Sequence, residues 1–134
     1  RRPGRSPAVN WTGVPAGAKS LAVTMHDPDA PLAGGFWHWL TVDIPVTATG
    51  LAQGAGSGGT LPDGAMPMPN GTKKPGYLGP CPPAGPAHHY DITVWALPDA
   101  TASVTADMSA ADIGVWLEKT AIDKATITPV FARP

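Results

Sequence analysis

Proline and glycine content limits what this chain can fold into more than any other feature of the sequence. The 134 residues include 17 Pro and 16 Gly, which together make up about a quarter of the chain. Proline lacks a backbone N–H and breaks helix interiors, and glycine in a helix interior costs about 1 kcal/mol relative to alanine. The acidic residues are all Asp except Glu118, and Asp favours turns and caps over helix interiors. We therefore expect strands joined by loops, with little helix.

Length and composition predict one folded domain and exclude several classes of protein. Hydrophobic residues make up 43% of the sequence and include five Trp, so the chain can bury a core, and its length predicts a single domain over 1–134. The net charge of −1 argues against nucleic-acid binding, and no apolar run approaches the roughly 18 residues of a membrane-spanning helix. The single cysteine, Cys81, excludes an internal disulfide and fits a reducing compartment such as the cytoplasm. Because the chain starts with Arg1, export directed by a preceding segment stays open.

Hydrophobic patterns predict four strands and one helix. The predicted strands cover 19–24, 36–44, 88–97 and 126–131. Pro129 interrupts the last of them and places it at a sheet edge. In the predicted helix 109–120, Ser109 can cap the first turn, and Trp116 and Leu117 lie on the apolar face. The expected fold is therefore dominated by β-structure: an antiparallel β-sandwich with one or two short helices and a long Gly/Pro-rich loop.

The connection between the second and third predicted strands is unusually long. It covers 45–87, whereas loops in compact domains seldom exceed about 12 to 15 residues. Its 54–59 stretch is Gly-rich, which predicts flexibility, but the prolines between 75 and 83 stiffen its second half. A long loop that is stiff is typical of the wall of a binding site.

Polar side chains interrupt the apolar rows of the two longest predicted strands. Strict alternation places His38 on one face with four apolar residues of the same strand, Phe36, Leu40, Val42 and Ile44. It also places His88 and Tyr90 on one face of the third strand, with His89 on the opposite face. Each has a purely structural explanation, as a hydrogen-bonded core residue or a half-buried aromatic residue. Their convergence at strand ends beside a stiff loop instead predicts a small polar pocket.

These residues belong to an ordered set of motifs along the chain. The set comprises Asp-Pro-Asp-Ala-Pro at 27–31, Gly-Gly-Phe-Trp-His-Trp at 34–39, Gly-Tyr-Leu-Gly-Pro-Cys-Pro-Pro at 76–83 and His-His-Tyr at 88–90. It resembles the successive signatures of the phosphatidylethanolamine-binding protein family, also called Raf kinase inhibitor-like proteins, in its bacterial branch. The resemblance covers nearly the whole chain.

The resemblance implies a β-sandwich with a small cavity that binds phosphate-like anions and phospholipid head groups. Carried over by position, the cavity is lined by Asp27, Asp29, Pro31, His38, Gly79, His88 and Tyr90. Imidazole and phenol groups supply directed donors, and backbone N–H groups of a Gly/Pro turn can form an anion-binding concavity. The resemblance implies a binding protein that is not an enzyme, with no cofactor and no metal. A regulated kinase or protease and a second copy in a homodimer are the candidate protein partners.

The sequence departs from the family pattern at three places. His89 stands where Arg is usual, and its strand face points away from the pocket, so we expect the change to weaken a structural salt bridge more than ligand binding. Phe36 stands where Trp is common, which keeps an apolar wall but removes an indole donor. The family also has opening strands before Ser6, so we expect this domain to lack the N-terminal strands of its family.

Two enzymatic interpretations stay open beside the binding function. A hydrolase or isomerase could use His38 or His88 as a general base oriented by Asp27. Cys81, near His88 in the sequence, is a candidate nucleophile for such an enzyme. Alternatively, the same two histidines and Asp27 have the composition of a mononuclear metal site with two imidazoles and one carboxylate.

Overall fold

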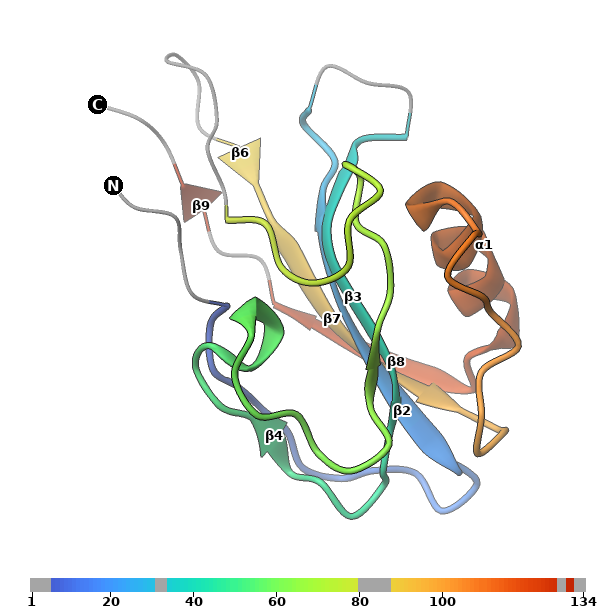
Figure 1. Ribbon diagram of the computed structural model, residues 1–134. Coiled ribbons are helices and arrows are strands. Elements are labelled where there is room, and N and C mark those ends of the chain that lie inside the picture. Colours follow the sequence, from blue (N-terminus) through green and yellow to red (C-terminus); the bar gives the residue numbers. More distant parts are fainter. Residues whose placement is uncertain (1–5, 31–33, 80–87, 128–129, 132–134) are drawn as a thin grey trace.

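Antiparallel strands dominate the part of the chain that the structure describes, where one α-helix packs beside them (Figure 1). The computed structural model describes residues 6–30, 34–79, 88–127 and 130–131. The elements are β1 (Val9–Asn10), β2 (Ser20–Asp27), β3 (Phe36–Ile44), β4 (Gly50–Leu51), the 3-10 helix η1 (Ala55–Ser57), β5 (Met66–Pro67), β6 (His88–His89), β7 (Asp91–Leu97), α1 (Ala110–Thr120), β8 (Asp123–Ile127) and β9 (Val130–Phe131). No helix in these described ranges is long and apolar enough to cross a membrane.

A five-stranded antiparallel sheet forms the centre, in the order β5-β3-β2-β7-β8. Two further pairs, β1 with β4 and β6 with β9, form two-stranded antiparallel sheets. The predicted strand 126–131 is thus divided between two sheets, and Pro129 lies outside the described residues. Its first part, β8, occupies an edge of the central sheet, as an interrupting proline predicts.

Each face of the central sheet has its own apolar core. We call the first the helix-side core, because α1 covers it with Ile113 and Leu117, both without exposed surface (Figure 1). The second, the loop-side core, is covered by the β1–β4 pair and by η1. Antiparallel strands with one α-helix are therefore confirmed. The sandwich stays a prediction, since the described layer opposite the helix consists of a two-stranded pair and loops.

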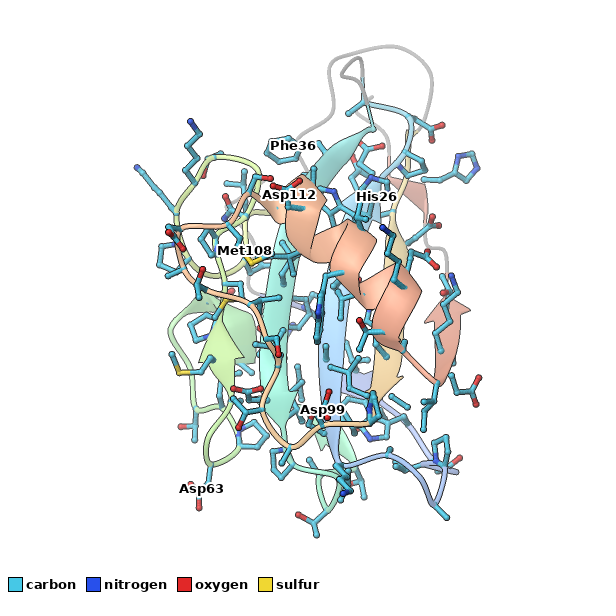
Figure 2. All side chains as sticks on the ribbon, turned by 90° about the vertical axis from the view of Figure 1, so that its right-hand side faces the viewer. His26, Phe36, Asp63, Asp99, Met108 and Asp112 are labelled. Atoms are coloured by element: carbon cyan, nitrogen blue, oxygen red, sulfur yellow. The ribbon has the colours of Figure 1, made fainter. Side chains whose placement is uncertain are left out.

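Helix α1 forms where the sequence predicts it, because its signals are local. The Ser109 hydroxyl caps the first turn by accepting a hydrogen bond from the Asp112 backbone N–H at 3.1 Å. Figure 2 shows this first turn, marked by Asp112, at the same end of the sheet as Phe36. Gly114 is buried against the Trp37 indole, where any Cβ atom would collide with the ring. The helix can therefore approach the sheet closely at Gly114.

Strict alternation fails twice in β3, which corrects the predicted faces. Opposite β2, Met25 pairs with Trp39 but His26 pairs with Trp37, so His38 is an extra residue in the ladder. A second irregularity lies near Asp43, whose φ is +59°. As a result Leu40 and Val42 lie in the helix-side core, and Trp39 and Ile44 lie in the loop-side core. His38 contacts Tyr90, which belongs to the loop-side core together with Ile44. The prediction that His38 shares a face with Leu40 and Val42 is therefore wrong, because β-bulges depend on the neighbouring strand.

The Gly-rich 54–59 stretch forms η1 instead of the predicted flexible segment. Gly56 is buried, and a Cβ atom there would lie 2.5 Å from the Trp39 Nε1 atom. The Gly56 backbone N–H donates to the Ser6 hydroxyl at 2.7 Å, and the Ser6 backbone N–H donates to the Ser57 hydroxyl at 2.6 Å. Glycine is needed here so that the chain can lie directly on an indole ring.

Candidate functional site

Three predicted site residues meet at one end of the central sheet, the upper end in Figure 1. Asp27 ends β2, His38 lies near the start of β3, and Tyr90 directly precedes β7. Because these strands are antiparallel neighbours, the end of β2 adjoins the starts of the other two. Asp27, His38 and Tyr90 are 3%, 6% and 0% exposed. Buried polar side chains at one sheet end provide the chemistry of a small polar site.

The His38 ring is held in one orientation. Its Nδ1 atom lies 2.8 Å from the Leu78 carbonyl oxygen, and since a carbonyl only accepts, Nδ1 carries a proton. Protonation to imidazolium therefore occurs at Nε2. The ring also contacts the rings of Phe36 and Tyr90 nearly edge-on, at centroid distances of 4.8 and 5.4 Å. His38 therefore faces Phe36 and Tyr90, at the position of the bulge in β3.

The segment before Gly79 is tied to β3 and η1. The Leu78 backbone N–H donates to the His38 carbonyl at 2.8 Å, which makes a two-point contact between these two residues. The Tyr77 backbone N–H donates to the Gly56 carbonyl at 2.8 Å. The Tyr77 ring stands edge-on to Trp39, and burial raises the pKa of its phenol. Gly79, half-buried, follows directly, so its backbone lies beside His38.

Asp27 and Asp29 differ in their hydrogen-bond partners and in their exposure. The Asp27 carboxylate accepts a hydrogen bond from the Asp29 backbone N–H at 2.9 Å, the turn contact expected of Asp before Pro. Asp29 instead faces His89, accepting from its backbone N–H at 2.7 Å and from its Nδ1 at 2.8 Å. Asp29 and His89 side chains are 41% and 55% exposed. Asp29 therefore lies on the outer side of the turn, whereas Asp27 is buried.

Part of the predicted set lies beyond what the structure describes. Pro31 and Cys81 fall outside the described residues. The backbone of His88 pairs with Phe131 in the β6–β9 sheet, but its side chain is outside the description. The expected meeting of His38 with Tyr90 is thus observed, and that of His38 with His88 stays a prediction. Among the described side chains, no three His, Cys, Asp or Glu groups form a metal-binding cluster.

Sequence reasoning missed two features near this end of the sheet. The first is the contact between His89 and Asp29, which are 60 positions apart and share no local pattern. The second is a cavity of about 550 Å3 between the start of β3, the 69–73 segment and the start of α1. Phe36 lines this cavity and also contacts His38. None of the predicted site residues whose side chains the structure describes lines it.

Comparisons with known proteins agree on one family. The sequence model described as phosphatidylethanolamine-binding protein matches residues 2–132. Escherichia coli YbcL is 46% identical over 129 residues, which cover 94% of this chain and 70% of YbcL. E. coli YbhB is 41% identical over 128 residues, which cover 95% of this chain and 81% of YbhB. The crystal structure of YbcL, described as a member of the mammalian PEBP family, matches with a TM-score of 0.92 at 44% identity and covers 98% of this chain and 82% of that one.

Proposed function

Because the chain belongs to the phosphatidylethanolamine-binding protein family, we propose that it binds small anionic ligands, phosphate-bearing molecules or phospholipid head groups, without catalysing a reaction on them. Family membership, predicted from the motifs, is confirmed, and it supports a ligand-binding role. The observation that carries the finer proposal is the burial of Asp27, His38 and Tyr90 at one end of the central sheet, with His38 in contact with Tyr90 and hydrogen-bonded to Leu78. Regulation of a kinase or protease stays a prediction from the resemblance.

The chemistry of these groups fits a phosphodiester. In its imidazolium form, His38 offers an Nε2–H donor, and Tyr90 offers a hydroxyl donor. Hydrogen bonds that involve an ion, such as those to a phosphodiester, are roughly twice as strong as hydrogen bonds between neutral groups. The site is largely withdrawn from water, so each such donor interacts more strongly with an anion than it would on the surface. His88 and the backbone of Gly79 are the proposed further donors.

Asp27 gives the proposed site a preference for zwitterionic ligands. A carboxylate beside an anion site repels the anion unless it binds a cation or orients a donor. The ammonium group of a phosphatidylethanolamine head group is such a cation, and it is linked to the phosphate by two carbons. We therefore expect Asp27 to accept from the ligand ammonium while the donors of His38 and Tyr90 face the phosphate.

The two tyrosines of the chain allow a matched test of this proposal. Tyr90→Phe removes one hydroxyl at the proposed site, and Tyr77→Phe removes one from a tyrosine outside it. We expect Tyr90→Phe to weaken glycerophosphoethanolamine binding about tenfold or more, the effect of a lost hydrogen bond to a charged group, and Tyr77→Phe to leave it unchanged. Calorimetric titration at pH 7 measures both. Equal losses in the two variants, or no binding by the unsubstituted chain, would contradict the proposal.

A further inference from the structure

His89 makes two contacts with one carboxylate. Its backbone N–H and its Nδ1–H both donate to the Asp29 Oδ2 atom, at 2.7 and 2.8 Å. The two donors come from one residue, so the carboxylate oxygen is fixed relative to β6. The Asp29 backbone N–H in turn donates to the Asp27 carboxylate. His89 thus connects through Asp29 to Asp27, a buried group of the proposed site.

The charge of this contact changes with the protonation of an imidazole. A neutral His89 ring donates its Nδ1–H and leaves the full negative charge of Asp29 in place. The imidazolium form makes the same hydrogen bond and cancels that charge, and imidazoles change form between about pH 5 and 8. Because Asp29 follows Asp27 by two residues, its charge acts on any anion bound beside Asp27.

Other titratable groups surround His89 and must be separated from it. Asp27 ends β2, Asp29 lies in the turn that follows, and Asp91 begins β7 two residues after His89. Asp91 pairs across the sheet with His26. Strand β9, the partner of β6, has no titratable residue. A test must therefore change the charge at position 89 alone.

From this contact we infer that His89 is a positioning residue of the proposed site, which holds Asp29 and, when protonated, neutralises it so that anions bind more tightly. The inference rests on the proposed function, whose anion site it tunes. The direction of the pH dependence follows: the affinity for an anion is higher below the pH range where imidazoles titrate, and it falls as the pH rises through that range. Both groups are partly exposed, so the effect is that of a surface ion pair, about two- to fivefold.

The test compares dimethyl phosphate binding by the unsubstituted chain, His89→Arg and His89→Gln, by calorimetry from pH 5.5 to 8.5. Dimethyl phosphate keeps one negative charge throughout this range. His89→Arg provides a permanent cation, and His89→Gln provides a neutral donor. We expect His89→Arg to bind about two- to fivefold more tightly than the unsubstituted chain at pH 8.5, and His89→Gln to bind about two- to fivefold less tightly at pH 5.5. Parallel pH profiles in all three proteins would overturn the inference.

A measurement without ligand separates this inference from the proposed function. We expect the carboxylate carbon resonance of Asp29 to shift between pH 5.5 and 8.5 together with the His89 ring, and His89→Gln to remove that shift. If the Asp29 resonance does not shift together with the resonances of the His89 ring, the inference is overturned even if dimethyl phosphate binds. If the two resonances shift together but none of the three proteins binds dimethyl phosphate or glycerophosphoethanolamine, the proposed function is wrong. The inference that His89 adjusts the affinity of the site for anions is then wrong as well.

Discussion

At the scale of residues, the fold changes the protonation of Tyr77. Burial raises the pKa of its phenol, because the phenolate loses hydration in a partly apolar surrounding. The unfolded chain ionises near pH 10, below the folded chain, so stability is full below that pH and falls as the pH rises toward the folded pKa. We expect urea unfolding to show a steeper loss of stability between pH 9.5 and 11.5 in the unsubstituted chain than in Tyr77→Phe. Identical slopes would mean that the phenol is hydrated in the folded state.

His88 and His89 are adjacent residues for which we expect very different effects. The sequence predicts His88 on the face of Tyr90 by strand alternation, whereas His89 is exposed and bound to Asp29. At pH 7 we expect His88→Ala to weaken glycerophosphoethanolamine binding about tenfold or more, through loss of a charge-assisted hydrogen bond. We expect His89→Ala to weaken it by no more than about fivefold. Calorimetric titration of the two variants decides the assignment, and losses of equal size would refute it.

At the scale of elements, helix α1 allows a sharp comparison of neighbouring positions. Leu117 has no exposed surface and packs in the helix-side core, whereas Val115 is 52% exposed. We expect Leu117→Ala to lower the free energy of unfolding by about 2 to 5 kcal/mol and Val115→Ala to change it by less than about 0.5 kcal/mol. Urea denaturation measures both. A small loss at Leu117 would show that the helix does not depend on this contact.

Local signals explain which elements could be predicted from the sequence. Helix α1 was predictable because its cap, its apolar face and its exposed Glu118 and Lys119 all follow from residues within one segment. Strand β3 was predicted with its observed bounds, but its faces were not. The bulge at His38 depends on the register with β2, so no periodicity within the strand reveals it.

At the scale of the whole molecule, the candidate site was predictable in composition and only partly in arrangement. The motifs predicted Asp27, His38 and Tyr90 as site residues; all three are buried at one end of the central sheet, and the rings of His38 and Tyr90 are in contact. The prediction that Asp29 lines the pocket stays a prediction, and the contact of Asp29 with His89 was not predicted. That contact joins positions 60 apart, and only the folded sheet brings such positions together.

The contact between His38 and Leu78 has a consequence for how the molecule reaches its final form. It joins residues that are 40 positions apart. The neighbouring Tyr77 is hydrogen-bonded to Gly56, and Gly56 is hydrogen-bonded to Ser6, which is 50 positions away from it. Closing such distant segments is slow compared with forming a helix, because chain entropy opposes it before any contact forms. We therefore expect the site to form late in folding and a partly folded chain to lack it. A ligand of the proposed site would then bind only the folded chain, and its binding free energy would oppose unfolding.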